Sequence, residues 1–111
     1  MKKMEKDAPA KELRNMLAFE KIPESFEGVL VLEEVKADAH GVECLFWTVA
    51  VGETGLVVQK YTPSQIQRIR QFAEINRIND TQQLIGKTMG FKKAASANGR
   101  EKPRWYPAAI L

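Results

Sequence analysis

The stretch from Gly86 to Pro107, GKTMGFKKAASANGREKPRWYP, holds the residues of this sequence whose types and spacing could do chemistry. It opens with Gly86-Lys87-Thr88, which has the composition of the end of a phosphate-binding loop. Such a loop needs a second glycine five residues earlier, so that successive backbone N–H groups wrap the phosphates, and it must lead into a helix. That position holds Thr81, and strand-forming residues follow the motif. The spacing therefore argues against a nucleoside triphosphate site.

The same stretch interleaves cations with flat aromatic side chains. Proteins that bind a single nucleic-acid strand without reading its sequence combine cations along the phosphates with aromatic faces on which bases stack. The charge is also uneven, because residues 1–55 hold seven basic and eleven acidic side chains, whereas residues 56–111 hold ten and three. We therefore predict a strand-binding surface made by Trp47, Lys60, Lys87, Phe91, Lys92, Lys93, Arg100, Lys102, Arg104, Trp105 and Tyr106.

The aromatic members of this set could instead belong to the core. Successive side chains of a strand point to opposite faces, so one of Phe46 and Trp47 should face inward and the other outward. Leu45 shares a face with Trp47, which leaves Trp47 as either a core residue or a stacking platform. Of Trp105 and Tyr106, one should likewise point inward and one outward. The number of rings open to a base is not decided by the sequence.

Side chains suited to catalysis are few. The only histidine, His40, lies in a turn near Asp38, and the only cysteine, Cys44, lies in an apolar run that predicts burial. A nucleophilic thiol needs exposure and a base within hydrogen-bond reach, and a zinc site needs more Cys or His ligands. The neighbours Glu33 and Glu34 point to opposite faces of a strand and cannot share a proton. We therefore predict neither an enzyme nor a metal or other cofactor.

Length and composition are those of one globular domain. The chain has 111 residues, of which 44% are hydrophobic and 28% charged, enough for one modest core. No apolar run approaches the roughly 20 residues of a membrane span, and the lysine-rich start lacks the apolar stretch of a signal peptide. We therefore expect a cytoplasmic protein without a membrane partner.

The hydrophobic pattern predicts five strands. Val- and Leu-rich runs over residues 26–36, 42–51 and 56–61 are joined by the turn sequences ADAHG and GETG, which is typical of an antiparallel meander. Two further strands are predicted over 88–95 and 104–110, with ANGR as their turn. The prolines of the last strand place it at a sheet edge, because proline lacks a ladder donor.

Two helices are predicted around these strands. Thr62 and Gln65 form a capping box with a proline between them, which predicts a helix that ends near residue 80. Near the N-terminus, Asp7 as a cap and apolar residues at helical spacing predict a short amphipathic helix over Pro9–Phe19.

The order of these elements predicts the fold class. Three meander strands, a helix and a two-stranded hairpin occur in this order in the OB-fold, a five-stranded Greek-key barrel with a helix between its third and fourth strands. A split-sheet α+β fold is the alternative, but it would more naturally place a second helix between strands. We expect a mainly β protein in which residues 1–21 form a tail with a short helix and residues 22–111 form an OB-fold-like domain.

Three stretches, GVLVLEEVKADAHG, LFWTVAVGETG and IRQFAEINRINDTQQLIGKTMGF, resemble small single-stranded-DNA-binding OB-fold proteins of phages and plasmids. The similarity covers about residues 22–111. It implies binding of a single nucleic-acid strand, favouring DNA over RNA without deciding between them, in replication, recombination or repair of a mobile element, and it allows a homo-oligomer. The chain departs from the cellular single-strand binders, which end in a flexible acidic tail, because it ends PAAIL. Recruitment of partners through such a tail is therefore in doubt.

One feature of the pattern is unfavourable, and one alternative stays open. OB-folds grip oligonucleotides with the turns between strands 1 and 2 and between strands 4 and 5, and Asp38 in the first of these turns would repel phosphate. The alternative function is a protein-interaction module or homodimeric adaptor that uses the apolar outer face of the sheet or the N-terminal helix.

Overall fold

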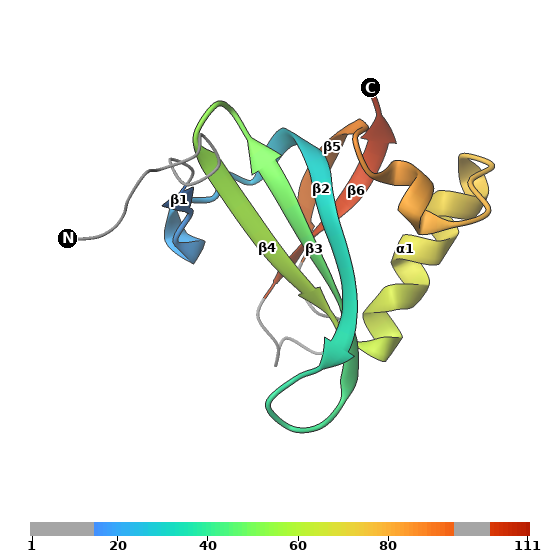
Figure 1. The fold of residues 1–111 in the computed structure, drawn as a ribbon. Helices are drawn as coiled ribbons and strands as arrows, with labels where there is room; N and C mark the ends of the chain where they lie inside the picture. The colour runs from blue at the N-terminus through green and yellow to red at the C-terminus, as the bar shows by residue number, and fades with distance from the viewer. Residues whose placement is uncertain (1–14, 95–102) are drawn as a thin grey trace, which may run out of the picture.

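The computed structural model describes residues 15–94 and 103–111 and gives them a mainly β architecture (Figure 1). Five longer strands form an antiparallel sheet, a short strand extends it, and one α-helix packs beside it. The elements are β1 (Asn15–Met16), the 3-10 turn η3 (Phe19–Lys21), β2 (Ser25–Ala37), β3 (Glu43–Val51), β4 (Gly55–Tyr61), α1 (Pro63–Ile75), the 3-10 turn η4 (Thr81–Leu84), β5 (Thr88–Ala94) and β6 (Arg104–Ile110).

The strand order is β1-β4-β3-β2-β5-β6, with β1 parallel to β4 and all other neighbours antiparallel. The meander β2–β3–β4 and the pairing of β5 with β6 confirm the predicted strands. The helix begins at Pro63 as its cap predicts, since the Thr62 backbone N–H donates to Gln65 Oε1 at 2.9 Å. β6 lies at an end of the sheet, as its prolines predict.

The sheet is not closed into a barrel. Within the described residues no backbone ladder joins β4 to β6, and side chains bridge the two strands instead. The Trp105 backbone N–H donates to Gln59 Oε1 at 2.9 Å, and the Tyr61 hydroxyl donates to the Trp105 carbonyl at 2.5 Å. Arg104 Nε donates to the Lys60 carbonyl at 2.7 Å. We call this bridged gap the β4–β6 seam.

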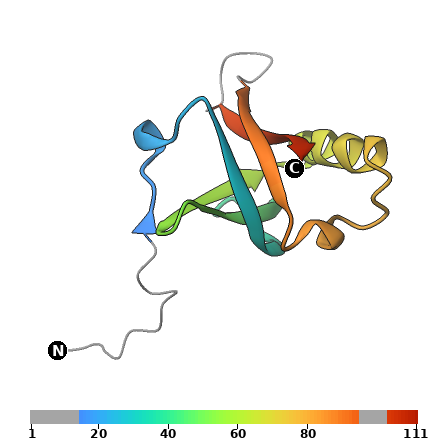
Figure 2. The ribbon, with the colours of Figure 1, turned by 90° about the horizontal axis from the view of Figure 1, so that it is seen from above.

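The core lies inside the curled sheet and against α1, which sits on the side of the sheet away from β1 (Figure 2). Its largest fully buried side chains are Trp47, Trp105, Tyr61 and Phe91, and α1 adds Ile69. The rings of Trp47, Tyr61 and Phe91, together with Tyr106, meet at centroid distances that are typical of packed aromatic clusters. The strands that carry the predicted site residues are therefore fixed by one shared core.

The helix ends earlier than predicted. α1 stops at Ile75, because Arg77 adopts a left-handed φ of 60° and Ile78 N–H returns to the Ala73 carbonyl at 2.8 Å. This is the Schellman-like ending that usually carries glycine. The residues up to 80 form a connection instead of further helix. No helix of residues 15–94 or 103–111 is long and apolar enough to cross a membrane.

The predicted N-terminal helix is wrong where the structure describes it. Asn15 and Met16 pair with β4 as β1, and the Leu17 N–H donates to the Leu56 carbonyl at 2.9 Å. Leu17 also packs over Gly55, with its Cδ1 3.4 Å from where a Cβ would lie. Pairing with an open strand edge therefore outweighs the local helical pattern. The earlier part of the predicted helix, and the predicted ANGR turn, lie outside the described residues.

Candidate nucleic-acid interface

The four aromatic side chains predicted to stack bases are buried. Trp47 and Trp105 are fully enclosed, Phe91 is 1% exposed and Tyr106 is 8% exposed. A base needs an open ring face on which to stack. Their burial contradicts the stacking role predicted for these residues and agrees with the core alternative.

Trp47 is held in the core by a carboxylate of the neighbouring strand. It lies opposite Glu33 of β2, and its indole N–H donates to Glu33 Oε2 at 2.8 Å. The same oxygen accepts from the Thr81 hydroxyl at 2.7 Å. The ring meets Tyr61 and Phe91 edge-on, at centroid distances of 5.8 and 6.4 Å. The polar atom is thus satisfied while the body of the ring fills the core.

The expectation that one of Trp105 and Tyr106 points outward is also wrong, because both faces of β6 are covered. On one face, Trp105 packs edge-on against Phe19 at 5.3 Å, and its indole N–H donates to the Pro23 carbonyl at 2.8 Å. On the other face, Tyr106 lies 5.5 Å from the Tyr61 ring, and the guanidinium of Arg68 lies 4.0 Å from its centroid. Segments far away in the sequence therefore cover a strand that alternation alone would leave half open.

The predicted cations do not gather on one side of the β5–β6 hairpin. Lys92 and Lys93 are neighbours on β5 and point to opposite faces. Lys93 Nζ lies 5.4 Å from the centroid of Trp105 and 3.9 Å from Glu24 Oε2, so it serves contacts within the chain. Lys87 and Lys92 are exposed, while Arg100 and Lys102 lie outside the described residues.

The structure brings another set of residues together on the side of β2, β3 and β4 that faces away from the core. Cross-strand register aligns Glu34, Phe46 and Lys60 in one row, and Leu32, Thr48 and Val58 in the next. We call this surface the outer face. With Lys36, which follows Glu34 by two residues on β2, it consists of Leu32, Glu34, Lys36, Phe46, Thr48, Val58 and Lys60.

Phe46 is the aromatic residue that the outer face offers to a ligand. Its ring is partly buried, and the Lys36 ammonium lies 4.9 Å from the ring centroid. Lys36 also pairs with Glu34 at 3.4 Å. Sequence reasoning named Trp47 for this role and left open which of the pair faces outward; the structure places Phe46 outward.

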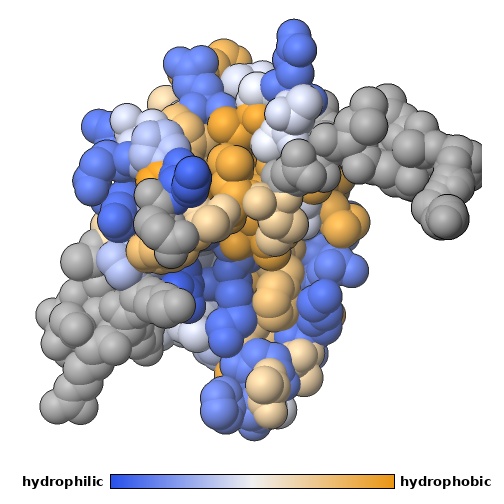
Figure 3. Space-filling model, turned by 90° about the vertical axis from the view of Figure 1, so that its left-hand side faces the viewer, coloured by the Kyte–Doolittle hydropathy of each residue, from blue (hydrophilic) through white to orange (hydrophobic). Residues whose placement is uncertain are grey.

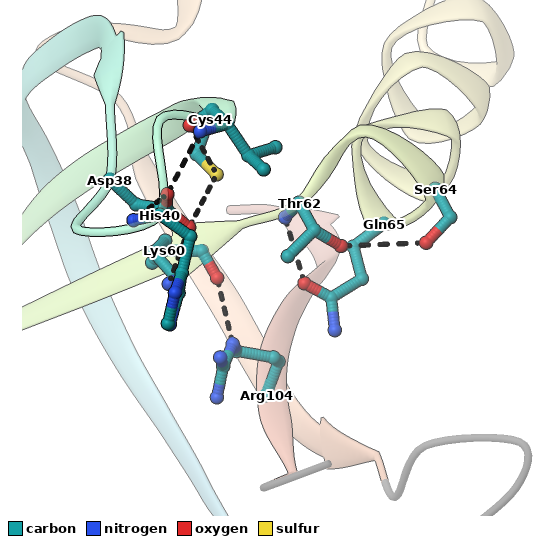
Figure 4. Close-up of polar contacts among 9 residues, drawn as sticks. Asp38, His40, Cys44, Lys60, Thr62, Ser64, Gln65 and Arg104 are labelled. Carbon is teal, nitrogen blue, oxygen red and sulfur yellow. Dashed lines mark hydrogen bonds and ion pairs between the residues drawn. The ribbon is translucent and has the colours of Figure 1, made fainter.

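The turn between β2 and β3 closes over one end of the outer face, and its acidic residue is satisfied internally (Figure 4). Asp38 Oδ1 accepts from the backbone N–H groups of His40 and Val42, at 2.9 and 3.0 Å, and Oδ2 pairs with Lys60 Nζ at 3.2 Å. The backbone N–H of Val42, together with the backbone N–H of His40 and the Lys60 ammonium, lowers the pKa of Asp38 to about 2. Asp38 thus shapes the turn and anchors Lys60.

The same turn covers the only cysteine. Cys44 is fully buried, its Sγ lies 3.4 Å from the Val42 carbonyl and 3.8 Å from Asp38 Oδ2, and burial raises the pKa of its thiol. A buried thiol of raised pKa is a structural residue rather than a nucleophile. In the part of the chain that the structure describes, His, Cys, Asp and Glu form no group of three that could hold a metal ion.

Comparison of the chain with family models, curated proteins and solved structures finds no match.

Proposed function

We propose that the chain is an OB-fold domain that binds single-stranded DNA on its outer face. Along the sheet, the third, second, first, fourth and fifth of the long strands are neighbours, and α1 connects the third to the fourth. An OB-fold has this order and this helix position, and it binds oligonucleotides across the second and third strands, between the 1–2 and 4–5 turns. The β4–β6 seam lies where such a barrel would close.

The observation that carries the proposal is the position of Phe46. Its ring lies on the second long strand, Lys36 covers it at 4.9 Å, and Lys60 lies directly opposite on the third. A base that takes the place of the Lys36 ammonium gains a stacking contact worth about 1–3 kcal/mol. The Lys36 ammonium, displaced from the ring, and the neighbouring Lys60 ammonium then lie beside the phosphates of the stacked nucleotide.

The cations of this surface are held by carboxylates in the unbound chain. Glu34 pairs with Lys36 at 3.4 Å and Asp38 pairs with Lys60 at 3.2 Å. The Lys36–Glu34 pair is exposed, and such pairs are worth at most about 1 kcal/mol, so a phosphate can compete for Lys36. Lys60 keeps its bond to the nearly buried Asp38, and the 33% of its side chain that is exposed can face a phosphate. With Arg104 beside Lys60, three cations border the path of a strand. Three phosphate contacts on a single strand give a salt slope of about −2.

Fluorescence anisotropy of a labelled oligo-dT strand tests the proposal. A slope of about −2 corresponds to a loss of affinity of about 20-fold between roughly 50 and 200 mM salt. Lys60→Ala should make the slope shallower, whereas Lys87→Ala, an exposed lysine away from the outer face, should leave it unchanged. If oligo-dT does not bind at low salt, the chain is not a single-strand binder.

Phe46 variants separate stacking from simple apolar contact. Phe46→Leu keeps an apolar side chain and removes the ring, so it should weaken oligo-dT binding by about 1–3 kcal/mol, at least about fivefold. Phe46→Trp keeps a ring of larger area and should retain binding. Equal affinity of the Leu and Trp variants would move the stacking site away from the outer face.

A protein-interaction module remains the second candidate, because apolar side chains are exposed on the same side of the chain. Figure 3 looks at the side that carries β1 and β4 and shows hydrophobic side chains gathered near its centre. Met16, Phe19 and Val58 are 61%, 38% and 37% exposed. Docking through such a surface depends little on salt, in contrast to strand binding through counterion release. The two-salt titration above therefore distinguishes the two functions.

A further inference from the structure

Two adjoining clefts run along α1 on the side where it meets the β2–β3 hairpin. One, of about 230 Å³, is lined by Val35, Leu45 and Ile66, among others, and the second, of about 430 Å³, continues past Ala73 and Ile78. The clefts share two lining residues and so form a single groove. We call it the α1 groove. Its floor is apolar in the first cleft, whereas the second cleft adds Ala73 and Ile78 among polar residues.

Val35 is an inward-facing side chain of the groove that no other part of the described chain covers. It lies opposite Leu45 in the β2–β3 ladder, so both side chains are on the inner face of the sheet. Leu45 is 6% exposed, whereas Val35 is 62% exposed. The hairpin extends past the end of α1 and leaves this inward-facing valine uncovered. Burying an exposed valine of this kind in a complex is favourable by the hydrophobic effect.

The rim of the groove is acidic. Glu33 and Glu43 line the first cleft, Glu74 and Asp80 line the second, and Arg70 lies between them. Four carboxylates and one guanidinium give the rim a net negative charge. An apolar floor with an acidic rim fits a segment that carries apolar side chains and several lysines or arginines.

We propose that the α1 groove binds the N-terminal segment, residues 1–14, of a second copy of this chain. That segment, MKKMEKDAPAKELR, carries five basic and three acidic side chains, and its apolar residues include Met1, Met4 and Leu13. Its charge is thus opposite to that of the rim, and its methionines suit an adaptable apolar floor.

The position of β1 favours a neighbouring copy over the segment's own groove. β1, which the segment precedes, lies on the side of the sheet away from α1 (Figures 1 and 2). Fourteen residues span roughly 50 Å when fully extended, and the molecule measures 45 × 32 × 25 Å. Reaching its own groove would require nearly full extension around the sheet, whereas a neighbour's groove can be brought to the segment.

A donor segment and an acceptor groove on different sides of the molecule make a head-to-tail contact, which continues from copy to copy instead of closing as a symmetric dimer. If the proposed function holds, such a contact places successive copies along one DNA strand and makes DNA binding cooperative. The contact itself does not require nucleic acid, so it can be tested without it.

Sedimentation equilibrium of the full chain without DNA provides the test. At about 50 mM salt, the average mass should rise above the 12.6 kDa of one chain as concentration increases, and salt of about 500 mM should reduce this association. Glu43→Lys combined with Glu74→Lys, both exposed, should weaken association by about tenfold or more. The control reverses two exposed acids outside the groove, Glu27→Lys with Glu53→Lys, and should associate as the native chain does.

Charge exchange identifies the occupant. Lys2→Glu with Lys3→Glu should weaken association as the groove variant does, and combining all four substitutions in one chain should restore it. A native chain that remains at the mass of one copy at low salt overturns the proposal, as does a groove variant that associates like the control. Because oligo-dT binding is measured separately, failure of this contact leaves the proposed function standing, and the reverse also holds.

Discussion

The β4–β6 seam offers the sharpest test of the fold, because two side chains of β4 bind the backbone N–H and carbonyl of one β6 residue, Trp105. The Trp105 N–H donates to Gln59 Oε1 at 2.9 Å, and the Trp105 carbonyl accepts from the Tyr61 hydroxyl at 2.5 Å. Gln59 is 6% exposed and the other two residues are fully buried. Burial also raises the pKa of Tyr61, so the hydroxyl stays protonated and remains a donor at any ordinary pH.

Removing either side-chain partner should destabilise the fold by an amount that the geometry predicts. Gln59→Leu leaves the buried Trp105 N–H without its acceptor, which costs about 1–3 kcal/mol of unfolding free energy. Tyr61→Phe keeps the ring and removes one donor from a carbonyl, which costs about 0.5–1.5 kcal/mol. A domain of this size has a total stability of about 5–15 kcal/mol, so both losses are measurable.

Urea unfolding followed by fluorescence of the two tryptophans measures these free energies. Gln71→Leu, at an exposed position of α1, is the matched control and should change stability by less than about 0.5 kcal/mol. The double variant Gln59→Leu/Tyr61→Phe should cost less than the sum of the single variants, because both act on the backbone of the same residue, Trp105. If Gln59→Leu is as stable as the Gln71→Leu control, the seam does not depend on these bonds and the reasoning fails.

Three further predictions follow from single residues. Because folding lowers the pKa of Asp38 to about 2, its negative charge stabilises the fold above its unfolded pKa of about 4, and this contribution is lost as the pH falls toward 2. Asp38→Asn should therefore lose less unfolding free energy than the native chain between about pH 4 and about pH 2. Equal losses in the two proteins would contradict the assignment. Arg77 has a φ of 60°, so Arg77→Gly should raise the unfolding free energy by about 0.5–1 kcal/mol, and an unchanged or lower value would count against strain there. The buried Cys44 thiol, whose pKa burial raises, should react with a thiol reagent only as fast as the fold opens and at once in urea; rapid reaction of the folded chain would place the thiol at the surface.

The strands and α1 could be predicted because their signals are local. Alternating Val and Leu, glycine-containing turns and a capping box each act over a few residues. The structure has β2, β3, β4 and β6 within one residue of the predicted bounds, and α1 starts at Pro63 as predicted but ends at Ile75, about five residues early. The prediction of an N-terminal helix failed because the deciding contact is distant in the sequence. Its helical spacing competes with the edge of β4, some 40 residues away in the sequence, and no local pattern reports that edge.

The rings of the candidate site divide in the same way. Alternation decides that Phe46 and Trp47 face opposite sides, and the aliphatic side chains that share a face with Trp47 place it inward. For Trp105 and Tyr106 alternation is insufficient, because η3 covers one face of β6 and α1 covers the other. A residue's exposure depends on what packs over its face, and that follows from the tertiary arrangement alone.

The charge asymmetry of the sequence is likewise rearranged by the fold, and this bears on how a strand would be held. Lys93, Lys60 and Arg104 of the basic half are engaged by Glu24, by Asp38 and by a backbone carbonyl. Lys36, which covers Phe46, comes from the acidic half. A net charge of +7 in one half therefore overstates the phosphate contacts of the outer face. With about three such contacts, the salt-dependent part of binding is small, so the ring of Phe46 should carry a large share of the affinity for any single strand.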